Sequence, residues 1–413
     1  MIEFEKFTLK NGLRVLVHQD VSSPMVAVNL LYDVGARDEI PDKTGFAHLF
    51  EHLMFGGSAN IPDFDGPLQL VGGQSNAFTS NDITNYYDIL PASNVETAFW
   101  LESDRMQQLA FTPTSLEVQR KVVIEEFKQR YLNQPYGDLW LLMRPLAYKE
   151  HPYKWPTIGK EISHIESAEL QDVKDFFYKH YGPQHAILCV SGDIYRLKVE
   201  ELCHKYFEDI KKRKPYIRNL PKESAQAEYR ELIVERDVPA SLIMKAWHMP
   251  SRTEEGYHAT DLLSDILSRG NSSRLFNALV KEQELFSDIS AYVMGSFDRG
   301  LFIVSGKIRT GIDPKKASEA IDEQLHKLKV ELVSDKELQK VKNKLEAEHL
   351  FSEMSILNKA MALCQYELLG DANRINTDIE NYNILVPDDL KKMANELFRK
   401  ENENALFYLA KTK

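Results

Sequence analysis

The stretch GFAHLFEHLMF, residues 45–55, carries the strongest indication of fold in this sequence. Its apolar residues recur at helical spacing and predict a largely buried helix that ends at two glycines. His48 and His52 are four residues apart, so both imidazoles face the same side of that helix, and Glu51 lies beside them. Two imidazole nitrogens can bind zinc, and a neighbouring carboxylate can take a proton from a water molecule that zinc activates. The stretch therefore predicts a buried helix with a catalytic zinc site.

The third zinc ligand cannot be chosen from spacing alone. Catalytic zinc usually has three protein ligands and a water molecule, so a carboxylate or another histidine is still needed. The predicted helix 115–131 is one source, because Glu126 follows Val122 by four residues and Val123 by three and so points toward an apolar stripe. The alternatives are a solvated helix face at Glu126, a His- and Glu-rich surface helix without a metal, and a structural zinc site. A structural site is the weakest of these, because it needs four protein ligands and has no use for Glu51.

The composition limits the classes of partner. The 413 residues are enough for two or three domains, and 43% hydrophobic with 27% charged residues indicates a globular protein with buried cores. Lys and Arg number 51 against 62 Asp and Glu, a net charge of −11, which argues against nucleic acid and anionic membrane surfaces as partners. No run approaches the ~18 apolar residues that a membrane helix needs.

The first residues and the cysteines bear on location. MIEFEKFTLK, residues 1–10, lacks the apolar centre of a signal peptide, so we expect a cytoplasmic protein, with a mature periplasmic form as the alternative. The three cysteines, Cys189, Cys203 and Cys364, form no CxxC pair. They favour a reducing compartment and buried thiols over disulfides or a cysteine-bound zinc.

The chain divides into two similar halves around a predicted linker. Residues 211–228 contain KKRKP, two prolines and little apolar periodicity. We therefore predict a zinc-binding domain at 1–213, a linker at 214–228 and a homologous domain without metal at 229–413. Mixed strand and helix runs favour α+β domains, each a mixed sheet with helices, over a doubly wound parallel sheet. The similar order of elements indicates an internal duplication.

The expected elements follow from periodicity and from turn and capping residues. Asn11-Gly12 between two β-rich runs predicts a hairpin, and Thr112 before Pro113 predicts the start of a helix. The expected strands are 7–9, 13–17, 25–31, 76–90 and 185–190 in the first half and 231–236, 241–247, 289–294 and 301–308 in the second. The expected helices are 45–55, 93–109, 115–131 and 197–207, followed by 255–267, 314–328 and 335–350.

Several further segments, together with the His48–His52 motif, match the sequence pattern of a known protein family. They are FTLKNGLRVLV (7–17), DVGARDE (33–39), TGFAHLFEHLMFGG (44–57), GGQSNAFTSNDITNYY (72–87), LEVQRKVVIEEFKQR (116–130), HPYKWPTIG (151–159) and SSRLFNALVKE (272–282). With them the sequence resembles the pitrilysin or insulinase family of zinc peptidases, the inverzincins, whose signature is HxxEH. It is most similar to bacterial homologues of the mitochondrial processing peptidase subunit. The resemblance covers the whole chain and is densest over residues 5–195.

This resemblance implies a function and a set of site residues. The chain is expected to be a Zn²⁺-dependent endopeptidase, with Glu51 as the base. Glu126 matches the family's third ligand, which ends the pattern E-R-x-V-x-x-x-E and stands 74 residues after His52. The first Glu of that pattern is Gln119 here, which puts any supporting role at that position in doubt. The segment Asn76-Ala77-Phe78-Thr79 resembles the family's edge strand, on which a peptide substrate lies as an added strand, with Asn76, Ala77 and Phe78 as the substrate-binding residues.

The resemblance also implies an assembly. In the family four α+β halves enclose a chamber, and short chains reach that number by dimerising. The second half contains no HxxEH, and the helix 255–267 carries only His258. Where the family has the substrate-binding pattern L-R-x-x-x-G-L-x-Y, Val280 replaces the Arg and Ser287 the Tyr. We therefore expect a heterodimer with a homologous subunit that supplies both groups. The alternatives are a homodimer in which the loop 151–159 supplies other donors, and a non-catalytic scaffold subunit of the same fold.

Overall fold

The computed structural model describes residues 1–411, and its contacts divide the chain into two compact units. The first unit contains residues 1–129, 155–220 and 350–377. The second contains residues 130–154, 221–349 and the C-terminal residues from Asp378. The division at 220/221 falls inside the predicted linker, but two segments of chain are exchanged between the predicted contiguous halves.

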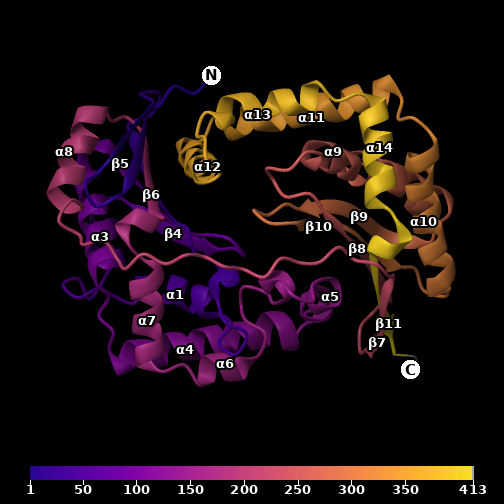
Figure 1. Cartoon of the computed structure of the whole chain (residues 1–413), viewed down its shortest axis with the longest axis horizontal. Coiled ribbons are helices and arrows are strands. Elements are labelled where there is room, and N and C mark those ends of the chain that lie inside the picture. Colours follow the sequence, from indigo (N-terminus) through magenta and orange to yellow (C-terminus); the bar gives the residue numbers. More distant parts are fainter. Residues whose placement is uncertain (412–413) are drawn as a thin grey trace. The chain divides into compact units, whose positions relative to one another are not determined.

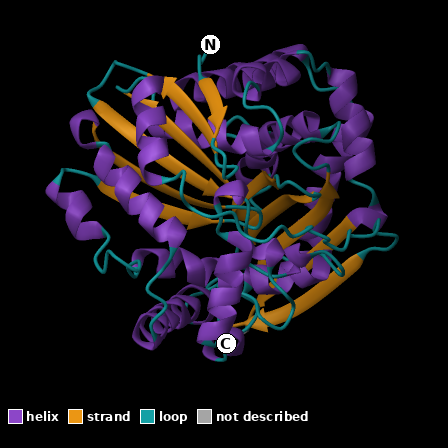
Figure 2. Ribbon diagram, turned by 60° about the vertical axis from the view of Figure 1, so that its left-hand side comes forward, coloured by secondary structure: helices purple, strands orange, loops and turns teal. Residues whose placement is uncertain are grey.

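The first unit is built on a six-stranded mixed sheet with the order β1-β2-β6-β3-β5-β4. Neighbouring strands are antiparallel except for β2 and β6, which run parallel. The predicted hairpin is confirmed as β1 and β2, whereas the extended run 76–90 is two strands joined by a turn. β4 forms one edge of the sheet. Figure 2 shows the strands in orange. The strands are β1 (Glu5–Thr8), β2 (Arg14–Gln19), β3 (Met25–Tyr32), β4 (Gln74–Thr79), β5 (Thr84–Pro91) and β6 (Ala186–Gly192).

The helices of the first unit lie against this sheet and against each other (Figure 1). Thr112 caps one of them as predicted, because its hydroxyl accepts the Ser115 N–H at 3.0 Å. That helix ends at Phe127 and is followed by a π-helical turn, so the predicted end at 131 is four residues late. The helices are α1 (Phe46–Phe55), α2 (Asp65–Leu70), α3 (Glu96–Gln107), α4 (Pro113–Phe127), α6 (Ile162–Glu166), α7 (Leu170–His180), α8 (Arg196–Tyr206) and α12 (Ile356–Leu368).

The second unit repeats the plan with a five-stranded sheet of order β7-β11-β8-β10-β9. Only β7 and β11 run parallel, so this sheet is also mixed and both units are α+β as predicted. The strands are β7 (Arg230–Arg236), β8 (Leu242–Met249), β9 (Phe286–Met294), β10 (Gly300–Ile308) and β11 (Glu403–Ala410). The helices that lie in it wholly or in part are α5 (Leu139–Ala147), α9 (Tyr257–Ser268), α10 (Pro314–Val330), α11 (Asp335–Ser352), α13 (Arg374–Asn383) and α14 (Pro387–Leu397).

Two helices account for the exchange of segments. α5 precedes α6 in the sequence, yet its buried Met143 and Ala147 pack in a core with Leu242 and Met244 of β8. α12 follows the second sheet in the sequence, yet it packs on β3 and β6 of the first unit. The contiguous domains 1–213 and 229–413 therefore differ from the compact units, because each sheet buries one face under a helix from the other half of the chain.

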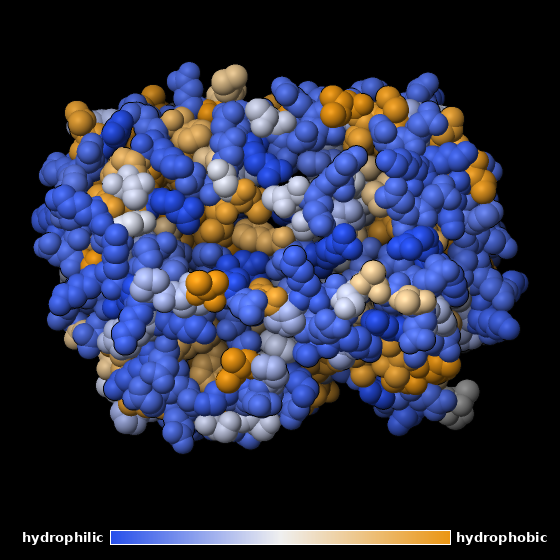
Figure 3. Space-filling model, in the orientation of Figure 1, coloured by the Kyte–Doolittle hydropathy of each residue, from blue (hydrophilic) through white to orange (hydrophobic). Residues whose placement is uncertain are grey.

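The visible face in one view of the molecule is mostly polar. Figure 3 shows hydrophilic side chains over most of the visible face, with apolar ones scattered among them. Within residues 1–411, no helix combines the length and apolarity needed to cross a bilayer. Cys189, Cys203 and Cys364 are buried and form no disulfide, as predicted.

Candidate metal centre

The helix α1 places the predicted motif at the edge of the core of the first unit. All its apolar residues except Phe55 are buried, whereas the side chains of His48 and His52 are 12% and 25% exposed. The two imidazole rings lie 4.8 Å apart and nearly perpendicular. The four-residue spacing thus brings both rings to one side of the helix, as predicted.

The helix α4 supplies the third side chain. Glu126 Oε2 lies 3.3 Å from His52 Nε2 and 3.6 Å from His48 Nε2. Its neighbour Glu125 instead pairs with Lys128 and has a side chain that is 60% exposed. Of these two glutamates, Glu126 is therefore the one that lies against the histidines, and its role as the third zinc ligand stays a prediction. Part of the sequence argument was wrong, however, because Val122 is exposed and the buried stripe of α4 contains Leu116, Val123 and Phe127.

Contacts beyond α1 hold α4 in this position. Arg120, one turn and a half before Glu126, donates from Nε to the Ile165 carbonyl at 3.1 Å and from its guanidinium to the Ala168 carbonyl. It also pairs with Glu117 on its own helix. These bonds join α4 to α6 and limit how far Glu126 can move from the two histidines.

The three side chains fit a zinc ion. Their donor atoms all lie within 4.8 Å of one another, and in the part of the chain that is described they are the one such group of His, Cys, Asp and Glu. Zinc binds imidazole and carboxylate at ~2.0–2.2 Å, so two tetrahedral ligands lie about 3.3–3.5 Å apart. The Nε2–Oε2 distances of 3.3 and 3.6 Å match that spacing. His48, His52 and Glu126 would therefore hold zinc, with one coordination position left for water or substrate.

The predicted base, Glu51, is held by a residue of the predicted substrate strand to which the sequence assigned no role of its own. The hydroxyl of Thr79, at the end of β4, donates a hydrogen bond of 2.6 Å to Glu51 Oε2. Thr79 directly follows Phe78 in the predicted substrate strand, so the sequence indicates that it lies near the substrate. Its contact with Glu51 depends on how β4 packs on α1, which spacing does not reveal.

The start of α1 is held by a second unforeseen residue, Glu39. Its carboxylate accepts the N–H groups of Gly45 and Ala47, each at 2.9 Å, and its side chain is buried. Burial raises the pKa of Glu39 to about 8, against the opposing effect of those two hydrogen bonds. Gly45 has φ +87°, and a Cβ there would lie 2.6 Å from the Ile158 carbonyl oxygen, so only glycine fits.

The predicted substrate residues lie on the edge strand β4. Asn76 is exposed, while Ala77 and Phe78 are partly exposed, and β4 pairs with β5 on one side. The Asn76 side chain accepts the N–H of Ala77 at 2.8 Å. An edge strand with accessible backbone can accept an added strand.

The second unit has no comparable centre among its described residues. His258 on α9 is partly covered, and its Nε2 lies 3.1 Å from Asp378 Oδ1. Val280 is buried in the core of this unit, and Ser287 is exposed on β9. Neither side chain can take the place of the Arg and Tyr of the family pattern.

Family models match both halves of the chain. Residues 14–155 match "Insulinase (Peptidase family M16)", and residues 167–345 match "Peptidase M16 inactive domain". A zinc protease of Helicobacter pylori, PqqE, is 32% identical over 98% of this chain and 92% of its own length. The chain belongs to peptidase family M16.

Two further comparisons agree with this placement. YmxG of Bacillus subtilis, named an uncharacterized zinc protease, is 24% identical over 97% of both chains. The crystal structure of a protease from Helicobacter pylori superposes with a TM-score of 0.93 at 31% identity, covering 99% of this chain and all of that one. The recognition of the pitrilysin and insulinase family is therefore confirmed, whereas the closer likeness to processing peptidase subunits stays a prediction.

Proposed function

We propose that this chain is the catalytic subunit of a zinc endopeptidase that cleaves peptides or unfolded polypeptides. The observation that carries the proposal is the convergence of His48, His52 and Glu126 beside Glu51. Three zinc ligands and one adjacent carboxylate are the groups that hydrolysis of an amide requires. The relatives that are named zinc proteases support the same activity.

The residues of the chain divide the chemistry among them. Zinc, when bound, would polarise the scissile carbonyl and make a water molecule acidic enough to give up a proton near neutral pH. Glu51 takes that proton from the attacking water and passes it to the nitrogen of the leaving amine. His48, His52 and Glu126 hold their donor atoms in place on two helices, so no ligand has to be reoriented during the reaction.

The substrate would bind as an added strand on β4, beside Asn76, Ala77 and Phe78. Main-chain hydrogen bonds to an edge strand tolerate many side chains, which suits a peptidase with a broad range of substrates. The strand ends at Thr79, whose hydroxyl contacts Glu51. A peptide on β4 would therefore pass close to the base.

We further propose that full activity needs a homologous partner subunit. Val280 and Ser287 stand where the family pattern has an Arg and a Tyr. In the family these two side chains would hold the substrate carbonyl and the oxyanion. A partner of the same fold would supply them and complete the chamber of four α+β halves, and a homodimer would lack both groups. The cytoplasmic location and the exclusion of nucleic-acid and membrane partners also stay predictions.

The second candidate is a scaffold subunit that keeps the fold without catalysis. The match of residues 167–345 to a model described as an inactive domain favours it for that half. The intact group of His48, Glu51, His52 and Glu126 in the other half weighs against it for the whole chain.

A metal assay combined with a cleavage assay separates the two. Zinc content is measured on the purified chain, and cleavage of quenched fluorescent peptides is measured for the chain alone and with a candidate partner added. Zinc with partner-dependent cleavage that Glu51→Gln abolishes supports the proposal. Zinc without cleavage under either condition would favour the scaffold, and equal turnover with and without the partner would refute the partner requirement.

A further inference from the structure

One hydrogen bond joins the proposed base to the edge strand. Thr79 is the last residue of β4 and pairs with Thr84 of β5, and its hydroxyl donates to Glu51 Oε2 at 2.6 Å. A hydrogen bond to a carboxylate is stronger than one between neutral groups and restricts rotation of the carboxylate. A shift of β4 would therefore move the Glu51 carboxylate as well.

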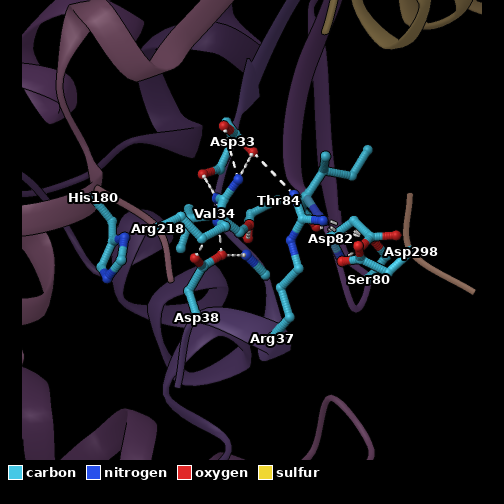
Figure 4. Close-up of polar contacts among 12 residues, drawn as sticks. Asp33, Val34, Arg37, Asp38, Ser80, Asp82, Thr84, His180, Arg218 and Asp298 are labelled. Carbon is cyan, nitrogen blue, oxygen red and sulfur yellow. Dashed lines mark hydrogen bonds and ion pairs between the residues drawn. The ribbon is translucent and has the colours of Figure 1, made fainter. Parts of the chain in front are cut away.

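The turn that follows Thr79 is fixed by the segment 33–38. The N–H of Ala36 donates to the Ser80 carbonyl at 3.2 Å, and that of Arg37 donates to the Asn81 carbonyl at 2.9 Å. The Arg37 guanidinium lies 3.1 Å from Asp82 of the same turn (Figure 4). The β4–β5 turn is thus bound at three successive residues, and Thr79 cannot shift without breaking these contacts.

The close approach of the two segments depends on a glycine. A Cβ on Gly35 would lie 2.5 Å from the Asn81 carbonyl oxygen and 2.6 Å from the Asp82 nitrogen. Any larger residue would push the turn away, and Thr79 with it. The absence of a side chain at Gly35 therefore helps to set the distance between β4 and α1.

The segment 33–38 is itself held by Arg218 from the predicted linker. Its guanidinium donates to Asp33 at 2.9 Å and to Asp38 at 2.7 Å, and it also donates to the Asp33 carbonyl at 2.7 Å (Figure 4). Arg37 adds a further contact to Asp33 at 3.3 Å. Two arginines, Arg37 and Arg218, thus pair with three aspartates, Asp33, Asp38 and Asp82, around the segment that supports the β4–β5 turn.

We propose that Thr79 is a positioning residue that orients Glu51 for proton transfer. The inference rests on the proposed peptidase function and deepens it. Glu51 has a flexible side chain, and one oxygen fixed to a rigid turn limits the orientations of the other. A base that is misplaced by about 1 Å can lose on the order of a hundredfold in rate, so the hydroxyl affects turnover rather than binding.

The first test compares Thr79→Val with Thr79→Ser. Valine keeps the branched shape and removes the hydroxyl, whereas serine keeps the hydroxyl. We expect Thr79→Val to lower kcat roughly tenfold to a hundredfold with KM within about twofold and zinc content unchanged. Thr79→Ser restores most of kcat, and Thr114→Val, an exposed threonine on α4, leaves it unchanged. Wild-type kcat in Thr79→Val, or a loss confined to KM, would overturn the inference.

The second test does not depend on activity. The melting temperature is measured for Thr79→Val, Glu51→Ala and the double variant, all without metal. If the hydroxyl holds Glu51, Thr79→Val lowers Tm by about 2–4 °C in the wild-type background and by much less in the Glu51→Ala background. Equal shifts in both backgrounds would overturn the inference. Unequal shifts in a protein with no peptidase activity would uphold the contact and reject the proposed function.

Discussion

The helices α1 and α9 start in the same way but carry different side chains at corresponding positions. Each follows a glycine with left-handed backbone, Gly45 at φ +87° and Gly256 at φ +89°. Counted from these glycines, the positions of His48, Glu51 and His52 correspond in α9 to residues that are buried and apolar. Those residues are Ala259, Leu262 and Leu263.

This difference separates the requirements of the fold from those of the site. The apolar side of α9 runs through all three positions, so the helix can bury them completely against the second sheet. In α1 the same positions hold polar side chains that stay partly exposed, and the helix loses part of its apolar contact area. The second α+β unit therefore keeps its fold with apolar residues at the positions of the proposed zinc ligands and base, and packing alone does not account for the polar residues of α1.

The contrast between α1 and α9 is wrong if replacing the histidine of α9 lowers zinc content as much as replacing a histidine of α1. We expect His52→Ala to remove most of the zinc and all measurable cleavage, because two ligands remain where catalytic zinc needs three. Zinc content and peptide cleavage measure both effects. His258→Ala is the matched control, and it should keep about one zinc per chain. His258 lies beside Asp378 but belongs to no group of three possible metal ligands among residues 1–411. Equal zinc loss in both variants would contradict the assignment.

The base gives the next largest effect. Glu51→Gln should keep zinc, because Glu51 is not a ligand, and lower kcat by ~10²–10⁴, because the amide cannot accept a proton. Zinc content and kcat are measured on the same preparation. Glu125→Gln, an exposed residue of α4, should change neither quantity. An active Glu51→Gln protein would reject the mechanism.

The cap of α1 should make stability depend on pH. Burial raises the pKa of Glu39 from 4.5 to about 8, so between these values the folded state binds a proton that the unfolded state has lost. The free energy of unfolding should therefore fall as pH rises from about 4.5 to about 8, by up to ~1.4 kcal/mol per pH unit. Urea unfolding at several pH values measures this slope.

Glu39→Gln tests whether this residue is the source of the slope. Glutamine does not titrate, so the variant should show a flatter dependence on pH, whatever its absolute stability. Glu117→Gln, a half-exposed residue of α4, should retain the wild-type slope. An unchanged slope in Glu39→Gln would assign the effect to another group.

The smallest effect concerns the altered motif of the second unit. Glu284 stands where the family pattern has glycine, and it adopts φ +52°, a conformation that costs other residues about 1–2 kcal/mol. Glu284→Gly removes this strain, but glycine has more conformational entropy in the unfolded state, which offsets part of the gain. The exposed ion pair between Glu284 and Arg309 contributes little. The variant should therefore be more stable than the wild type by up to about 1 kcal/mol. Denaturant unfolding measures the change. Glu282→Gly, in a helical turn, should instead destabilise by roughly 1 kcal/mol.

The sequence by itself determined the features that depend on short spacing. The pairing of β1 with β2, the capped start of α4 and the helix α1 follow from residues within a few positions of one another. His48 and His52 share a side of α1 for the same reason. Glu126 needed the family pattern as well, because the local argument relied on Val122, which proves to be exposed.

Only the tertiary structure decided which distant segments meet. α12 packs on the first sheet and α5 on the second. Hydrogen bonds link Thr79 to Glu51 and Glu39 to the start of α1. All these contacts join residues that are not related by helical or strand spacing. An amphipathic helix shows which of its sides is apolar but not which sheet it covers, because either sheet removes the same area from water. A hydroxyl or a carboxylate likewise shows what it can bind, whereas its partner is chosen by the packing of the chain around it.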